Sequence, residues 1–219
     1  MIIKIRQTAS NTKQTYEIDT ESSSYNASLG SLLFTQDILL VGNNTEIKGT
    51  FKPSALINYI PFSYLFKKNN FTRRFDIFRN NSPYGTVALW KQSFLAVCYV
   101  LTLNTGKTFH CYYTAKGSFS YISVYDGEKQ VALVETYLNT EDYKYTHKLY
   151  VLNDYNAYTE AFIFFVLYYS NYSFSKRFHM TYGSTYTSAR TFSKHNDKYN
   201  PDWREKHFPN ENYFGKFGL

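Results

Sequence analysis

The sequence has few of the residues and motifs that indicate a disulfide framework, a metal centre or an enzyme. Only two cysteines occur among 219 residues, so no disulfide framework holds the fold together. The cysteines do not form a Cys-x-x-Cys pair, and the five histidines lack metal-ligand spacing, so no metal site is expected. A Gly-rich phosphate loop and a Gly-x-Ser-x-Gly elbow are also missing, so we expect no catalytic residues, no cofactor and no enzyme activity.

Proline and helix-forming segments are scarce as well. The chain holds five prolines, and it lacks long stretches rich in Ala, Glu and Leu. Tyr and Phe are abundant, at 23 and 19 residues, and both suit the half-buried faces of sheets. The first residues carry Lys4 and Arg6 and form no apolar signal segment. We therefore expect a mainly β protein in the reducing cytoplasm.

The most apolar stretch spans residues 157–169 and reads AYTEAFIFFVLYY. It is shorter than the 20 or so apolar residues of a membrane-spanning helix, and it carries Glu160. A helix that is apolar on all sides must be enclosed by protein or lipid, and protein fits better here. Asn153 or Asp154 is expected to cap this helix, and Glu160 suits its positive end. A strand is the alternative, because short apolar runs hide their period, but the length favours a helix.

Strand patterns separated by turn residues precede this run. Three hairpins are predicted from their strands and their Asn-, Gly- or Pro-containing turns, at residues 74–90, 94–114 and 121–137. Further strands are predicted at residues 2–5, 38–41, 47–51 and 144–152. The remainder of the first 25 residues is polar, and residues 54–66 are expected to be irregular and to cover one end of a barrel.

The two cysteines fall on the middle hairpin. A turn over residues 104–107 would place position 113 opposite position 98. Cys98 and Cys111 would then be diagonal neighbours on one face, as two buried free thiols.

Geometry joins these elements. A helix with its side chains is about 10–12 Å across, whereas an eight-stranded barrel has room only for its own side chains. Enclosing a helix therefore needs roughly eleven or twelve strands, which residues 1–152 are long enough to supply. The sequence predicts a closed antiparallel barrel of about twelve strands around a central hydrophobic helix at about residues 155–169.

This order of hairpins, final strand and apolar helix resembles the tubby C-terminal-like superfamily, which includes tubby proteins, phospholipid scramblases, LURP-one-related proteins and small bacterial members. The resemblance covers residues 30–174 and implies a twelve-stranded barrel around a helix. It also implies an affinity for phospholipid headgroups through surface basic residues. Residues 175–219 depart from the pattern, so we predict a barrel domain at residues 1–174 and a basic, aromatic-rich extension at residues 175–219.

The net charge of +7 suggests where an anionic partner would bind. The densest basic cluster outside the extension consists of Lys67, Lys68, Arg73 and Arg74, which we name as candidate lipid- or anion-binding residues. A solvated loop is the commoner explanation of such a run. The extension holds eight Lys or Arg against four acids and many aromatics, a mixture suited to single-stranded nucleic acid, to a protein partner or to packing on the barrel.

We therefore expect a non-enzymatic, cytoplasmic binding or scaffold protein that associates peripherally with anionic phospholipid surfaces. One alternative is a barrel that binds a small hydrophobic ligand. A second is binding of nucleic acid or a protein partner through the extension. A third is an enzyme with a site at the barrel rim, although the missing motifs count against it.

Overall fold

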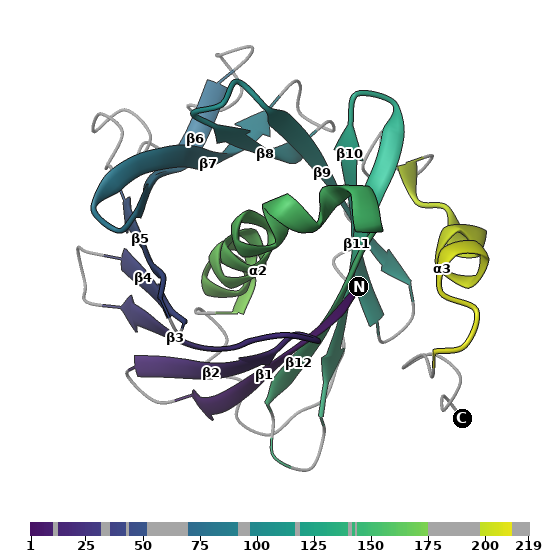
Figure 1. Cartoon of the computed structure of the whole chain (residues 1–219), viewed down its shortest axis with the longest axis horizontal. Helices are drawn as coiled ribbons and strands as arrows, with labels where there is room; N and C mark the ends of the chain where they lie inside the picture. Colours follow the sequence, from purple (N-terminus) through teal and green to yellow (C-terminus); the bar gives the residue numbers. More distant parts are fainter. Residues whose placement is uncertain are drawn as a thin grey trace, which may run out of the picture.

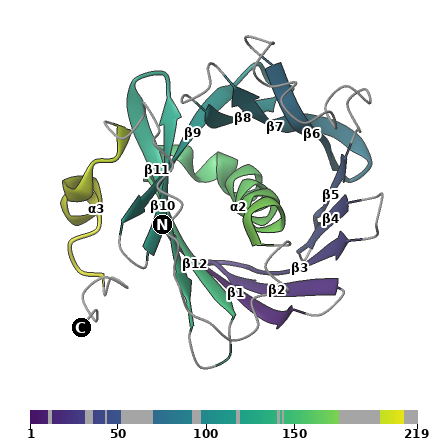
Figure 2. The same ribbon diagram turned by 180° about the vertical axis from the view of Figure 1, so that it is seen from behind.

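Twelve strands surround one helix in the computed structural model of the chain (Figures 1 and 2). The structure describes residues 1–10, 13–31, 36–42, 44–51, 70–91, 97–116, 119–139, 142, 144–174 and 198–211. The strands are β1 (Ile2–Ser10), β2 (Lys13–Asp19), β3 (Ser24–Ser31), β4 (Gln36–Val41), β5 (Glu46–Phe51), β6 (Asn70–Arg79), β7 (Ser82–Lys91), β8 (Val97–Leu103), β9 (Thr108–Lys116), β10 (Phe119–Asp126), β11 (Lys129–Leu138) and β12 (Tyr145–Val151). Each strand pairs antiparallel with its neighbours in sequence, and β1 pairs with β12 to close the barrel, which confirms the predicted fold class.

The inward faces of the strands supply the core. β2 alternates between exposed and buried positions, and its inward residues Tyr16 and Ile18 are buried. On β3 the buried residues are Ala27 and Leu29. The sequence reading missed both strands: β2 lies in the stretch interpreted as polar, and no strand was predicted over most of β3. Two inward apolar side chains are enough for a strand whose other face is in water.

The two ends of the barrel differ in how the strands are joined. At one end, short turns join β2 to β3, β4 to β5, β6 to β7, β8 to β9 and β10 to β11; we call it the turn end. Asn80 and Asn81 both have positive φ in the β6–β7 turn, as a type I′ hairpin requires. Gly106 and Gly127 take positive φ in the next two turns. At the other end, the loop end, the connections include residues 52–69, which lie outside the described residues, as does the predicted cover at residues 54–66.

The central helix enters at the turn end. A 3-10 helix, η2 (Asn153–Tyr158), follows β12 and leads into α2 (Thr159–Phe174). α2 runs toward the loop end, because Glu160 contacts Arg79 at the end of β6, whereas Tyr168 packs on Phe75 near its start. The helix is thus confirmed, and the competing strand interpretation is wrong.

The predicted bounds and caps of the helix need correction. α2 begins at Thr159 and continues to Phe174, so it starts and ends later than the predicted 155–169. Neither Asn153 nor Asp154 caps it: they lie in η2, which has no side-chain cap, and Asn153 Oδ1 accepts a hydrogen bond from the Met1 ammonium at 3.3 Å. Glu160 does lie in the first turn of α2, as expected.

The predicted arrangement of the cysteines is wrong by one residue of register. Tyr99 pairs with Cys111, which puts Cys98 and Cys111 on opposite faces. Cys111 lies in the barrel core, and Cys98 is buried on the outer face. Both are free thiols, as expected. Burial raises the thiol pKa of both, that of Cys98 to about 12.

A short helix lies outside the barrel. α3 (Pro201–His207) sits beside β10 and β11 in both ribbon views (Figures 1 and 2). We call residues 198–211 the strap. This part of the extension packs on the barrel, one of the possibilities open from sequence.

Candidate functional site

The barrel interior is occupied by α2. Every residue from Ala161 to Tyr169 is at most 2% exposed. Aromatic rings from the helix meet rings of the wall edge-on: Phe162 packs against Phe109 at 4.9 Å between centroids, and Phe165 packs against Tyr99 at 5.8 Å. The ring of Phe164 lies directly against the backbone of Gly49 on β5, where a Cβ atom would not fit. The helix therefore packs directly on β5, β8 and β9.

One titratable ring is enclosed with the helix. His147 is fully buried; its Nδ1 lies 2.9 Å from Thr136 Oγ1 and its Nε2 lies 3.0 Å from Ser170 Oγ. Ser170 Oγ donates its proton to the carbonyl of Val166, so it accepts from Nε2–H, and Thr136 donates to Nδ1. Burial lowers the pKa of His147 to about 3. The ring is neutral; its Nε2 joins β12 to Ser170 of α2, and its Nδ1 joins β12 to Thr136 of β11.

The turn end carries charges of both signs in contact. Arg79 Nη2 lies 2.9 Å from Glu160 Oε2, and Tyr25 donates to Glu160 Oε1 at 3.4 Å. Lys107 Nζ lies 2.5 Å from Asp126 Oδ2, which also accepts from the Tyr155 hydroxyl at 2.8 Å.

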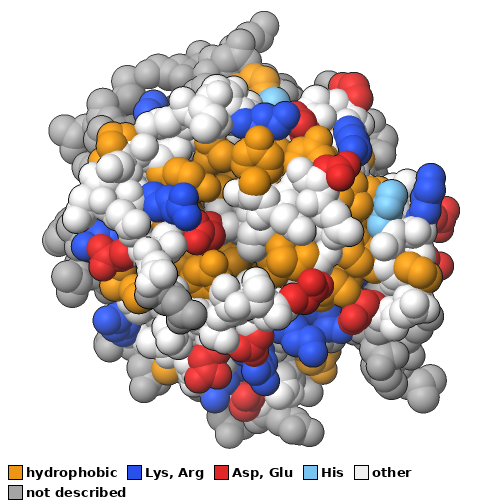
Figure 3. All heavy atoms as spheres, viewed as in Figure 1, with side chains coloured by type: hydrophobic (Ala, Val, Ile, Leu, Met, Phe, Trp, Pro, Cys, Tyr) orange, Lys and Arg blue, Asp and Glu red, His pale blue; other side chains and the backbone are white. Residues whose placement is uncertain are grey.

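The Lys107 ammonium lowers the pKa of the Asp126 carboxyl. In Figure 3, blue and red side chains are interspersed around a central orange area on the visible face. Because charges of both signs are mixed on this face, its described side chains produce no strong electrostatic field of one sign.

The excess positive charge of the chain falls outside the described residues. The described part holds 16 Lys and Arg against 15 Asp and Glu, whereas the rest of the sequence holds eight against two. Residues 52–69 contain three lysines and no acid, and residues 175–197 contain four cations and one acid. The first segment joins β5 to β6 at the loop end, and the second follows the end of α2 there. The three lysines of residues 52–69 therefore belong to a connection at the loop end, whereas residues 175–197 begin at the loop end and lead to Lys198, which contacts Glu128 at the turn end.

Two of the four predicted anion-binding residues lie on a described strand, toward the loop end. Lys67 and Lys68 lie outside the described residues. Arg73 is on β6, near its start, and its side chain is not described. Arg74 follows it, is exposed, and forms an ion pair with Asp76 at 3.2 Å between Nε and Oδ1. The structure thus brings the backbone of Arg73 and Arg74 to the loop end, with Arg74 partly neutralised.

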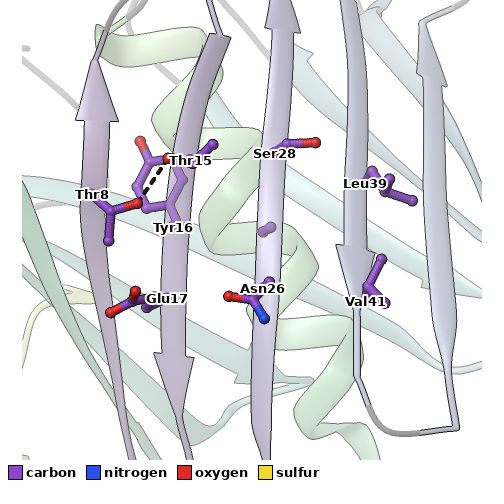
Figure 4. Close-up of a pocket in the computed structure, with 9 residues that line it drawn as sticks. Thr8, Thr15, Tyr16, Glu17, Asn26, Ser28, Leu39 and Val41 are labelled. Carbon is purple, nitrogen blue, oxygen red and sulfur yellow. Dashed lines mark hydrogen bonds between the residues drawn. The ribbon is translucent and has the colours of Figure 1, made fainter.

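A shallow hollow of about 240 Å³ lies on the outer face of β1–β4 (Figure 4). Thr8 and Thr15 share a hydrogen bond at 2.7 Å on one side, and Leu39 and Val41 form an aliphatic edge on the other. Val41 is 41% exposed. The sequence reading missed this surface together with β2 and β3.

The sequence reading left open that the extension packs on the barrel, but it missed the helix α3. Trp203 is only 6% exposed and forms a second cluster with Tyr121, Leu133 and Tyr150 on the outer face of the barrel. A signal for α3 was present: Asn200 accepts a hydrogen bond from the amide of Asp202 at 3.0 Å, and Pro201 follows the cap directly. A capping Asn before Pro and Asp is a usual helix start.

The described residues offer neither a metal site nor a membrane-spanning helix. Across the described ranges, no group of three or more His, Cys, Asp or Glu side chains is arranged to hold a metal ion. None of the helices in that part of the chain is both long and apolar enough to span a bilayer. Comparison with protein families, with curated proteins and with solved structures found no match.

Proposed function

We propose that the protein is a non-enzymatic binding or scaffold module of the tubby-like kind, whose loop end associates with anionic phospholipid surfaces in the cytoplasm. The observation that carries the proposal is the separation of charge. The described residues are almost neutral in sum, and most of the cations in excess lie in residues 52–69, which join two strands at the loop end, and in residues 175–197, which begin at that end.

The composition of residues 52–69 supports lipid as the anion. This segment combines its three lysines with many Ile, Leu, Phe and Tyr residues. Apolar and aromatic side chains beside lysines suit the headgroup region, where rings and aliphatic stems are buried while ammonium groups meet phosphates. Each cation near such a surface contributes about 1 kcal/mol.

The architecture supports a site on the outside. A hydrophobic ligand inside the barrel would need the volume that Phe162, Phe164 and Phe165 occupy. The twelve-stranded barrel around a helix is also the architecture that the tubby-like resemblance implies, although fold alone does not transfer function.

Liposome co-sedimentation tests the proposal. The full chain should sediment with vesicles containing phosphatidylserine and remain in solution with phosphatidylcholine alone, and raised salt should weaken binding. Lys67→Gln with Lys68→Gln should lower the partition coefficient roughly 30-fold, because about 2 kcal/mol is lost.

A matched control removes two cations from the opposite end. Lys48→Gln with Lys129→Gln lowers the net charge by the same amount and should change partitioning less than threefold. Equal sedimentation with neutral and anionic vesicles at low salt would refute the proposal. A salt-sensitive shift of single-stranded nucleic acid, lost on deletion of residues 175–219, would favour that alternative instead.

A further inference from the structure

The outer face of β10, β11 and β12 holds a site that the strap fills. Trp203 inserts between Tyr121, Leu133 and Tyr150. Tyr199 and Phe208 flank it, with ring centroids 4.8 Å from Tyr121 and 5.3 Å from Tyr150, respectively. The inserted Trp is surrounded by aromatic faces.

A buried carboxylate lies beside this aromatic pocket. Glu135 on β11 is 1% exposed, accepts a hydrogen bond from the Tyr150 hydroxyl at 2.8 Å, and forms an ion pair with Arg204 of the strap. Lys148 lies opposite Glu135 in the β11–β12 ladder, and its ammonium is 3.9 Å from Glu211 of the strap. A buried carboxylate is stabilised by cations and hydrogen-bond donors around it, and Arg204 supplies one of these cations directly after the inserted ring.

The strap has the properties of a tethered peptide ligand. α3 has only seven residues, and isolated helices of this length are unstable in water, so it is helical because it is docked. Residues 175–197 connect it to α2, and a segment of that length allows docking and release without disturbing the barrel. Under the strap, Tyr125 donates to the Lys198 carbonyl at 2.9 Å.

The contact is also less complete than a core. Neither side-chain polar atom of Gln130, the residue paired with Tyr125, has a partner within the described part of the chain. Buried side-chain polar atoms without a partner are uncommon in native structures.

We propose that this face is a recognition site for short protein segments in which an aromatic residue is followed directly by a cation, and that the strap occupies it as an intramolecular competitor. The partner inserts its ring into the Tyr121–Leu133–Tyr150 pocket and its cation onto Glu135. This inference does not depend on lipid binding.

The test uses the full chain with a protease site inserted between residues 184 and 185, and a fluorescein-labelled peptide of residues 198–211. A tether of this length keeps the strap at an effective concentration of about 1 mM, so micromolar peptide should not bind the uncut chain. After cutting and removal of the strap by gel filtration, fluorescence anisotropy should show saturable binding at least tenfold tighter than to the uncut chain.

Variant peptides test the chemistry. Trp203→Ala and Arg204→Gln peptides should each bind at least tenfold more weakly, whereas the Glu205→Gln peptide, changed at an exposed position, should bind like the parent. The uncut chain carrying Trp203→Ala and Arg204→Gln should bind the parent peptide without cutting. If this variant fails to fold, the binding of the peptides to the cut chain still tests the proposal.

Three results would overturn the proposal. The first is a strap that stays bound after cutting and does not exchange with labelled peptide. The second is a Trp203→Ala peptide that binds as well as the parent. The third is a dimer of the uncut chain formed by exchanged straps, which would assign the site to a second copy.

Discussion

His147 is a titratable ring enclosed by a mostly apolar interior, and it makes stability depend on pH. Its pKa is lowered by burial from the ordinary 6.5 to about 3, so the folded protein keeps it neutral while the unfolded chain takes up a proton. The contribution of His147 is fully present above pH 6.5 or so and is lost as the pH falls toward 3. The loss is at most about 1.4 kcal/mol per pH unit.

Urea unfolding at pH 7 and pH 4.5 measures this effect. The free energy of unfolding of the wild type should fall more between these pH values than that of His147→Gln, since other acid-sensitive groups such as Asp126 are common to both. Equal losses in the two proteins would contradict a neutral, buried His147.

The packing of α2 against the barrel wall can be tested at Gly49. Gly49→Ala would place a methyl group in the ring of Phe164, and such overpacking typically costs about 1–3 kcal/mol. Gly30→Ala is the control, because the nearest atom to its added Cβ is the Asp37 carbonyl oxygen at 3.9 Å. The midpoint of thermal unfolding should be lower than that of the wild type for Gly49→Ala and almost unchanged for Gly30→Ala. Similar midpoints in the two variants would mean that α2 can move away from Gly49.

The residue scale also shows where sequence reasoning fails. The hairpin turn was expected to use four residues, 104–107. In the structure the Leu103 amide donates to the Lys107 carbonyl, and Gly106 has a positive φ of 84°, so the loop has three residues. This difference of one residue moved Cys98 to the outer face. Register depends on turn geometry, which composition alone does not determine.

At the scale of elements, strong apolar patterns were predictable and weak ones were not. The three hairpins and the central helix were predicted correctly because each has a strong apolar pattern along the sequence. β2 and β3 were missed because each buries few large apolar side chains and is otherwise polar. The helix α3 was missed because it is too short for a periodic pattern. The pocket that holds Trp203 is built from β10, β11 and β12 and exists only in the folded chain.

Attachment of the strap can be tested at Glu135. Glu135→Gln leaves Arg204 buried without its carboxylate, which should cost about 3 kcal/mol of docking free energy. Hydrogen exchange of the α3 amides should then rise roughly 100-fold. Glu128→Gln removes an acid whose side chain is 93% exposed and contacts Lys198, and it should change exchange less than threefold. Similar exchange in both variants would show that the Arg204 ion pair does not hold the strap.

At the scale of the whole molecule, antiparallel closure sorts the connections into two ends. Even-numbered closure places the chain start, the five short turns and the entry of α2 at one end. The sequence predicted a barrel around a helix, because the apolar run and the hairpins together leave few alternatives. It did not predict that residues 52–69 and the C-terminal end of α2 lie at the same end, since this follows from strand direction around the complete barrel.

Hydrogen–deuterium exchange of the full chain with and without phosphatidylserine vesicles tests whether the loop end meets the anionic surface. Vesicles should slow exchange in residues 52–69 and 175–197, and leave α2 and the β6–β7 and β10–β11 turns unchanged. Unchanged exchange in both basic segments, or protection confined to the turn end, would contradict this contact.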